Sequence, residues 1–496
     1  MAPGNRSSKA SNSSDAATMV AEKEFWRGRK KQFGVAVGAS FILIQLLFLT
    51  TLSYLFGSIY RQSTRIHNLK VLAVDYDGGL IGQSLRGAYE NLAAPSFLGI
   101  EFKSEADGYA DVSDVVAAVR RGDYWAAVYT HAGASNRLAA ALGGGDAAST
   151  YNSSAAVTYV WNEIRYAAVA AGSIKSNMET LVSVSRAVYT HLNGSAALTS
   201  LDQSDPAAVA AYLNPIQASS INIKPSPQAA KTVYNTIPMV MGIIMQFFFL
   251  MAVNGVASSL QLYSHLPFVQ NLAVRVTLSL VYTLVGALCQ SAYFWAFKES
   301  WEQPASVFVL VWLCLWLYQH VQFLVFDVAT TFIPISFLPF FVLSWVIANV
   351  TSTISPFELS PGFYRWAYAL PAHETWQVLV TIWSGGAVNR LYRALPIMFA
   401  WVVVMAPSSF LALRWRCAKA VEAAAEEAER KEKERAEIEK EVGGGLREER
   451  EKARGAAAGR PRVDGAGSEE RDGRRELEYF PSLPTPFENT LRKLEQ

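Results

Sequence analysis

The stretch Lys70-Val-Leu-Ala-Val-Asp75-Tyr-Asp77-Gly78-Gly79 decides the fold of this chain. It is an apolar run with branched residues that leads into an acidic turn with paired glycines, which predicts a short buried strand and a turn. One strongly apolar segment precedes it, and the other apolar segments begin only after residue 230. We therefore expect a folded water-soluble module inserted between membrane-spanning segments.

Strand and helix patterns alternate through this module, which we place at residues 58–230. Strand patterns cover residues 71–75, 100–103, 124–129 and 157–161, and helix patterns cover residues 81–93, 112–121, 136–142 and 166–192. The alternation predicts an α/β domain. Residues 215–227 are rich in Pro, Ser and Asn, which predicts a linker that leads back to the membrane.

Six apolar segments are long enough to cross a bilayer as helices. They cover residues 33–57, 233–256, 272–297, 307–326, 332–350 and 395–413. A cleaved signal peptide is the alternative interpretation of the first segment, but its apolar region would be shorter and nearer to the start. Residues 356–389 are too polar in part to cross and are rich in Trp and Tyr, which predicts an outer re-entrant or surface segment.

These patterns predict an α-helical integral membrane protein with six transmembrane helices and an extracytoplasmic α/β domain inserted between helices 1 and 2. Transmembrane helices 2–6 would occupy residues 231–416. The composition of residues 1–32 predicts a disordered N-terminal cytosolic tail. For residues 417–496 we expect a charged cytosolic helix over 421–442 followed by a disordered tail.

Basic residues flank the first and the last apolar segment on what must be one side of the membrane. The set is Arg27, Arg29, Lys30, Lys31, Arg414, Arg416 and Lys419. The bias of Lys and Arg toward untranslocated loops places both termini in the cytosol and the α/β domain outside. Asn152-Ser-Ser and Asn193-Gly-Ser are then glycosylation acceptors in the outer domain, and we expect the plasma membrane.

The sequence argues against enzyme activity. Asp75 and Asp77 suggest a phosphatase nucleophile or a calcium loop, but the further ligands of both are missing, so a turn capped by carboxylates is the preferred interpretation. Gly143-Gly-Gly145 has no following Lys-Ser or Lys-Thr, which excludes a P-loop. His373-Glu374 lacks the second His of a zinc helix. The net charge is +2, with charges concentrated in the flanks of the chain, so we expect no nucleic-acid partner. The missing ligand patterns lead us to expect no metal and no cofactor.

Polar side chains inside the apolar segments are the candidates for a substrate path. Polar groups in lipid usually turn inward, where they bond neighbouring helices or line a path. The candidates, at the interface of spans one, two and five, are Gln45, Asn235, Gln246 and Asn254. Hydrogen bonding between helices is the alternative. Arg275 and Asp327 lie near span ends, and we expect them at the membrane interface.

The six-span plan resembles the exporter permeases of the ABC-2 type, on the strand and acidic turn of residues 71–79 and on Ser360-Pro-Gly-Phe-Tyr-Arg-Trp366. The chain is more similar to the fungal nitrosoguanidine-resistance family. That resemblance rests on Asp75-Tyr-Asp-Gly-Gly79, Gly122-Asp-Tyr-Trp-Ala126, Tyr159-Val-Trp-Asn-Glu163 and Tyr234-Asn-Thr236. It runs from about residue 33 to 416 and implies a fungal membrane protein that exports small toxic compounds. ABC-2 permeases work as dimers with a separate ATPase.

We therefore expect a permease-like protein that exports or translocates an amphipathic small molecule or lipid and contributes to resistance to toxic compounds. Its expected partners are the lipid bilayer, that molecule, a second copy of the chain and a separate ATPase. The alternative is a non-transporting membrane scaffold or sensor, whose outer module binds a ligand and whose tail recruits cytosolic partners.

Overall fold

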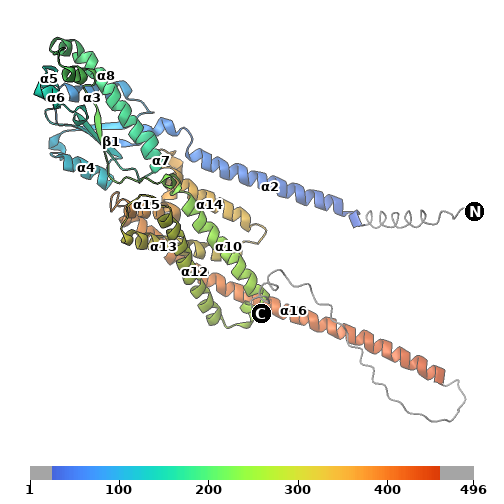
Figure 1. Cartoon of the computed structure of the whole chain (residues 1–496). Coiled ribbons are helices and arrows are strands. Elements are labelled where there is room, and N and C mark those ends of the chain that lie inside the picture. Colours follow the sequence, from blue (N-terminus) through green and yellow to red (C-terminus); the bar gives the residue numbers. More distant parts are fainter. Residues whose placement is uncertain (1–24, 458–496) are drawn as a thin grey trace, which may run out of the picture. The chain divides into compact units, whose positions relative to one another are not determined.

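A computed structural model describes residues 25–457 of the chain (Figure 1). The chain divides into two compact units, residues 1–424 and 425–496, and the sheet and helices α2 to α15 belong to the first. The greater part of the two tails predicted to be disordered, residues 1–24 and 458–496, lies outside the described residues.

A mixed five-stranded sheet forms the centre of the α/β domain. Its strands are β1 (Lys70–Asp75), β2 (Gly99–Lys103), β3 (Ala126–Thr130), β4 (Val157–Trp161) and β5 (Ala218–Asn222). They lie in the order β2-β1-β3-β4-β5. Strands β2, β1 and β3 are parallel, and β4 runs antiparallel to β3 and parallel to β5. The four strands predicted from the sequence are confirmed.

Strand β1 is buried because helices cover both faces of the sheet (Figure 1). Val71 and Ala73 pack on the side of α3 (Leu80–Leu92), α5 (Ala134–Leu142) and α8 (Ser176–Thr199), while Leu72 and Val74 pack against α4 (Val112–Arg121). Successive side chains of a strand point to opposite faces. A strand that is covered on both faces therefore reads as the continuous apolar run that opens the domain.

The predicted linker 215–227 is wrong in part, because it contains strand β5. Its polar residues gave no strand pattern, but its backbone pairs with β4, and Trp161 Nε1 donates a hydrogen bond to Ser220 Oγ at 3.0 Å. Glu163, which follows β4, binds the chain that continues beyond β5. It forms an ion pair with Lys231 and accepts a bond from the Ser226 backbone N–H at 3.1 Å. The sheet is thus connected directly to the start of the next helix.

The long helix predicted at residues 166–192 consists of α7 (Ala167–Val169), a π-helical segment (Ala170–Lys175) and α8. Short helical elements complete the domain: α6 (Asp146–Ser149), α9 (Pro206–Leu213) and 3-10 turns at Gln62–Asn68, Glu105–Asp107, Ser153–Ala155 and Ala229–Val233.

Within residues 25–457, five helices are long and apolar enough to cross a membrane. They are α2 (Arg29–Ser58), α10 (Ile237–Ser259), α12 (Phe268–Ala296), α13 (Ala305–Phe332) and the first part of α16 (Leu391–Ala457). The predicted fifth span corresponds to α14 (Leu338–Ile354), which has 17 residues. This is the pattern of a multi-pass helical membrane protein.

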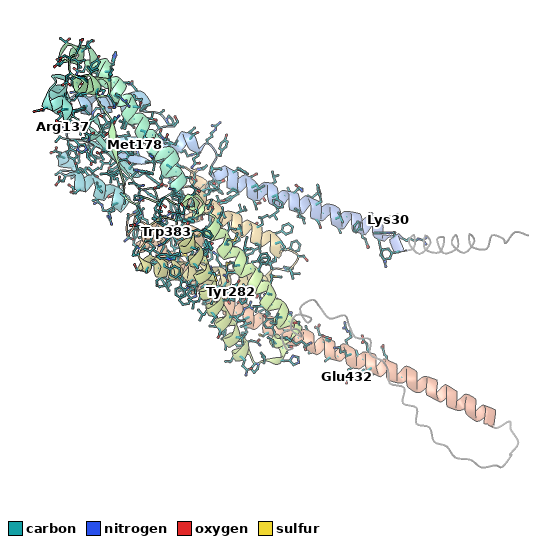
Figure 2. All side chains as sticks on the ribbon, viewed as in Figure 1. Lys30, Arg137, Met178, Tyr282, Trp383 and Glu432 are labelled. Atoms are coloured by element: carbon teal, nitrogen blue, oxygen red, sulfur yellow. The ribbon has the colours of Figure 1, made fainter. Side chains whose placement is uncertain are left out.

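Helix α13 lies at the centre of the apolar helices and contacts α10, α12 and α15 (Pro371–Trp383), whereas α2 is largely exposed and contacts α14. Gly242 permits the close approach of α10 to α13, since a Cβ atom there would lie 2.6 Å from the Tyr318 ring. A 3-10 turn (Gly362–Ala369) and α15 form the segment predicted to be re-entrant. Trp383 of α15 is buried among Tyr234, Phe294, Trp301 and Trp376 (Figure 2).

A short helix, α11 (Leu262–His265), lies between α10 and α12 along the chain, and α16 continues beyond its apolar part as a charged helix. The sequence predicts that the charged helix ends at residue 442, but α16 continues to Ala457. The glycines at 443–445 do not end it, because Glu, Arg and Lys on their C-terminal side are good helix formers.

Candidate functional site

Arg275 and Asp327 are buried within the protein, and their expected position at the membrane interface stays a prediction. Asp327 of α13 is 1% exposed and Arg275 of α12 is 5% exposed. Arg275 Nε donates a hydrogen bond to Asp327 Oδ1 at 3.1 Å, and its Nη2 bonds the same oxygen. Both helices extend beyond the predicted segments, α12 beginning at Phe268 and α13 ending at Phe332. The two charges therefore lie inside helices whose polar faces meet.

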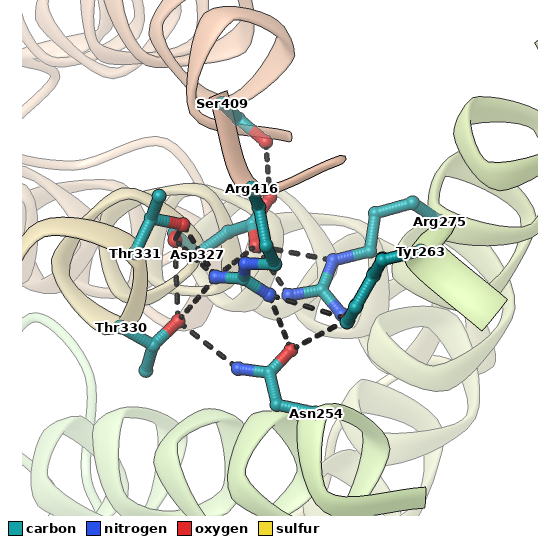
Figure 3. A network of polar contacts seen from close by, with 8 residues as sticks. All are labelled: Asn254, Tyr263, Arg275, Asp327, Thr330, Thr331, Ser409 and Arg416. Atoms are coloured by element: carbon teal, nitrogen blue, oxygen red, sulfur yellow. Dashed lines mark hydrogen bonds and ion pairs between the residues drawn. The ribbon is translucent and has the colours of Figure 1, made fainter. Parts of the chain in front are cut away.

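A second arginine reaches the same carboxylate from α16 (Figure 3). Arg416 Nη2 lies 3.8 Å from Asp327 Oδ1 and donates to the backbone oxygen of Asp327 at 3.4 Å. The Ser409 hydroxyl, also on α16, donates to Asp327 Oδ2. One acidic side chain thus joins α12, α13 and α16.

Arg416 also binds the end of α10 and the helix that follows. Its Nη1 donates to Asn254 Oδ1 at 2.5 Å and to the Tyr263 hydroxyl at 3.3 Å, and its Nη2 donates to Thr330 Oγ1 at 3.2 Å. Asn254 Nδ2 donates to the same threonine at 3.2 Å. We call this cluster the inner network; its members are Asn254, Tyr263, Arg275, Asp327, Thr330, Thr331, Ser409 and Arg416 (Figure 3).

The inner network carries a surplus positive charge, because two guanidinium groups face one carboxylate (+2 − 1 = +1). Arg275 Nη1 is buried and has no hydrogen-bond partner among the described residues. An unsatisfied buried donor costs about 1–3 kcal/mol. The described residues therefore leave part of the hydrogen-bonding capacity of Arg275 unused.

A groove of about 180 Å³ lies beside Arg275, between α12, α13 and α16. Its lining is mostly apolar and includes the polar side chains of Arg275, Ser279, His320 and Ser409. Val276, Leu280 and Phe410 line the groove and are exposed, so it opens sideways between the helices. We call it the lateral groove. An apolar lining with a few polar side chains fits a molecule with a polar head and an apolar body.

Three of the four candidate path residues contact separate polar layers along the helices. Asn235 precedes the first residue of α10 and donates to the backbone oxygen of Thr353 at 2.7 Å, near the sheet. Gln246 is buried and donates to Gln319 Oε1 at 3.2 Å. Asn254 belongs to the inner network. Gln45 is exposed on α2, outside all three layers.

The middle layer is a chain of three glutamines from α10, α12 and α13. Gln319 Nε2 donates to Gln290 Oε1 at 2.8 Å, and Gln290 Nε2 donates to the backbone oxygen of Pro238 at 2.7 Å. These bonds connect helices to one another, which is the alternative interpretation of polar residues within spans.

The carboxylates of the opening motif hold a turn. Asp75 Oδ1 accepts bonds from the backbone N–H of Asp77 at 3.1 Å and of Gly78 at 3.2 Å, and from Thr130 Oγ1 at 2.6 Å. Asp77 Oδ1 accepts from the Ser135 backbone N–H at 2.8 Å, at the start of α5. Gly78 has a φ of +62°, which favours glycine. These contacts are those of a capped turn that joins two loops.

The acceptor asparagines differ in exposure. Asn152 is exposed, whereas Asn193 is half-buried on α8 and donates to the Tyr189 hydroxyl at 3.0 Å. Asn349, in a third acceptor sequence, is buried and bonded to the backbone of Trp345 and Ala372.

Sequence reasoning missed the inner network although a signal was present. Asp327 is a single acidic residue with apolar neighbours on both sides, Val325-Phe326 and Val328-Ala329. An ionisable residue in such a place marks a functional site more often than an interface. Arg416 was assigned only to the basic flank of the last span.

No solved structure matches the chain. A family model does match residues 40–406, which include the α/β domain, the helices that follow it and the first part of α16. The chain belongs to this family, which is described as a protein of unknown function (DUF3533).

Proposed function

We propose that this chain is a permease-like membrane protein that moves an amphipathic small molecule or lipid outward across the membrane. The observation that carries the proposal is the lateral groove lined by Arg275, whose Nη1 has no hydrogen-bond partner among the described residues. A polar head would accept a bond from Arg275 there, and an apolar body would lie against Leu280 and Phe410. The open side between exposed apolar residues would admit such a molecule from the bilayer.

The inner network supplies the element that would change during transport. Asp327 connects α12, α13 and α16 through two arginines, and a head group that competes for Arg275 would weaken the connection to α12. A ligand can shift a conformational equilibrium only by binding one state better than the other. A head group that competes with Asp327 for Arg275 would bind the state in which this ion pair is open better than the state in which it is closed.

The resemblance to the fungal nitrosoguanidine-resistance family and to ABC-2 permeases supports the proposal and implies export of toxic compounds. We further propose six spans with α14 as the fifth, cytosolic termini, a plasma-membrane location and glycosylation at Asn152 and Asn193. The same resemblance suggests a dimer that works with a separate ATPase.

Transport is tested in proteoliposomes that contain the purified full chain. The probes are fluorescent analogues of phosphatidylcholine and phosphatidylserine, whose movement between leaflets is measured with and without ATP, together with a fluorescent amphipathic dye. The decisive variant is Leu280→Trp, which fills the lateral groove without touching the inner network. Leu280 is 41% exposed, so the larger ring can be accommodated, and we expect transport to fall at least about tenfold.

Val285→Trp is the matched control, since Val285 lies on the same helix, is 51% exposed and does not line the groove. Normal transport by both variants would place the path elsewhere. The absence of movement for every probe in the wild-type chain, with and without ATP, would contradict the proposal.

A scaffold or sensor is the second candidate, because the α/β domain contributes residues to a second cavity, which lies between this domain and the helical part of the chain. Deleting residues 421–496 distinguishes the two. A transporter core keeps its activity after the deletion, whereas a scaffold that recruits partners through its tail loses its function.

A further inference from the structure

A cavity of about 160 Å³ lies where the α/β domain meets the segment between α14 and α16. The α/β domain contributes Trp125, Arg165 and Tyr166, and the other lining residues include Glu358, His373, Arg390 and Arg393. We call it the outer pocket. Its size corresponds to about five water molecules at roughly 30 Å³ each, enough for a phosphate or carboxylate group.

Arg165 gives the outer pocket its strongest unsatisfied donor. Its side chain lies over the ring of Trp125, with Cζ 3.5 Å from the ring centroid, and the residue is 9% exposed. Arg165 Nη1 is buried and has no hydrogen-bond partner among residues 25–457. Burial lowers the pKa of Arg165 to about 10, so the guanidinium remains charged at neutral pH.

A second arginine is fixed by one backbone contact. Arg390 Nη2 donates to the backbone oxygen of Gly122 at 3.1 Å, which holds its guanidinium at the pocket. A planar guanidinium has five N–H donors, so most of the hydrogen-bonding capacity of Arg390 stays available.

The third arginine is already paired. Arg393 Nε lies 3.1 Å from Glu374 Oε1, and Arg393 Nη2 lies 3.5 Å from His373 Nε2. His373 Nδ1 bonds the backbone oxygen of Ser352 at 2.8 Å, and burial lowers the pKa of the ring to about 3. The imidazole is therefore neutral, and its Nε2 accepts from Arg393. With Arg393 paired to Glu374, the charged residues that a ligand would meet are Arg165, Arg390 and Glu358. Their net charge is +1 (+2 − 1).

We propose that the outer pocket binds an anionic group, a phosphate or a carboxylate, with Arg165 Nη1 and Arg390 as donors. The nitrogen without a partner among the described residues, the surplus charge and the volume of the pocket all favour such a ligand. The group belongs either to a free small molecule or to the head of a lipid. The inference does not depend on transport, since the outer pocket and the lateral groove share no residue.

A bound anion would connect the two parts of the first unit. Arg165 follows β4 in the sheet, while Arg390 immediately precedes α16. A ligand bonded to both arginines would hold the α/β domain against the helices. The two parts already contact each other here through the bond from Val388 N–H to the Arg120 backbone oxygen at 2.7 Å.

Binding is measured by isothermal titration calorimetry on the purified full chain in detergent. The two probes are inorganic phosphate and a short-chain, water-soluble phosphatidic acid. Comparable affinity for both indicates a site for free anions, and much tighter binding of the phosphatidic acid indicates a lipid head group. We expect Arg390→Gln to weaken binding about tenfold or more, because a charge-assisted bond is lost.

Glu358→Gln supplies a result of opposite sign. It removes the negative charge of the pocket, so we expect the affinity for either probe to rise about threefold or more, which misfolding would not produce. Arg121→Gln is the matched control, since Arg121 is exposed and pairs with Asp123 outside the pocket. No heat of binding with either probe, or equal affinities for wild type, Arg390→Gln and Glu358→Gln, would overturn the inference.

Discussion

The inner network and the outer pocket each contain a buried arginine, Arg275 and Arg165, and they solve the same electrostatic problem differently. In the inner network the chain supplies its own carboxylate, Asp327, to two arginines. In the outer pocket Arg165 stacks on Trp125 and keeps a nitrogen without a partner among the described residues. A buried charge is costly unless it is paired. The first cluster is therefore a connection between helices, and the second is suited to a partner from outside.

The largest expected effect comes from breaking the connection at Asp327. Asp327→Asn leaves Arg275 and Arg416 without their counter-charge, and loss of one partner of a buried pair costs about 3–5 kcal/mol. Denaturant unfolding of the purified chain in detergent measures this loss. The double variant Arg275→Met, Asp327→Leu should recover much of the stability, because a buried pair can be replaced by apolar residues. Wild-type stability of the single variant would show that the pair is dispensable.

The outer pocket should respond less to the loss of its arginine. Arg165→Met removes a cation–π contact worth about 0.5–2 kcal/mol, but it also removes an unpartnered buried donor, so we expect a net change of about 1 kcal/mol or less without anion. Saturating inorganic phosphate should raise the unfolding temperature of the wild type and leave that of Arg165→Met unchanged. A destabilisation as large as that of Asp327→Asn would mean that both clusters are structural.

The middle layer provides an uncharged reference for this comparison. Gln319→Leu removes the bonds to Gln246 and Gln290, and hydrogen bonds between membrane helices average about 0.6 kcal/mol. We expect a destabilisation of about 1 kcal/mol in the same unfolding measurement. A value near that of Asp327→Asn would show that charge is not what distinguishes the inner network.

The smallest effect is expected at Gln45. It is exposed on α2, so Gln45→Leu should change the unfolding free energy by less than about 0.5 kcal/mol and leave transport unchanged. Loss of transport at normal expression would restore Gln45 to the candidate path and would require a partner for α2 that a single chain does not provide.

Periodicity was sufficient to predict the elements that fold by local pattern. The strands at residues 71–75 and 157–161 were predicted from short runs rich in apolar and branched residues, and the helices at 81–93 and 112–121 from helix patterns. Strand β5 was missed because its stability comes from backbone pairing with β4, and its side chains carry no apolar alternation.

The candidate site was harder to predict, because it depends on which helices meet. Asn254 was chosen for its polarity, and the structure does place it in the inner network, but its principal partner, Arg416, is far away in the sequence. The position of Arg275 and Asp327 near the ends of apolar segments predicted the membrane interface, but it gave no indication of their burial, which follows from packing between α12, α13 and α16. Nothing near Arg165 in the sequence indicates that residue 390 shares its cavity.

The attachment of Glu163 to Lys231 and Ser226 has a mechanical consequence. It leaves little slack between the last strand of the sheet and α10, the helix that contributes both Gln246 and Asn254. A rotation of the α/β domain would therefore turn α10 as a lever, and the torque would reach the far end of the helix. The α/β domain is thus attached to the chain that enters α10, so its movement would change the orientation of the helix that carries both polar residues.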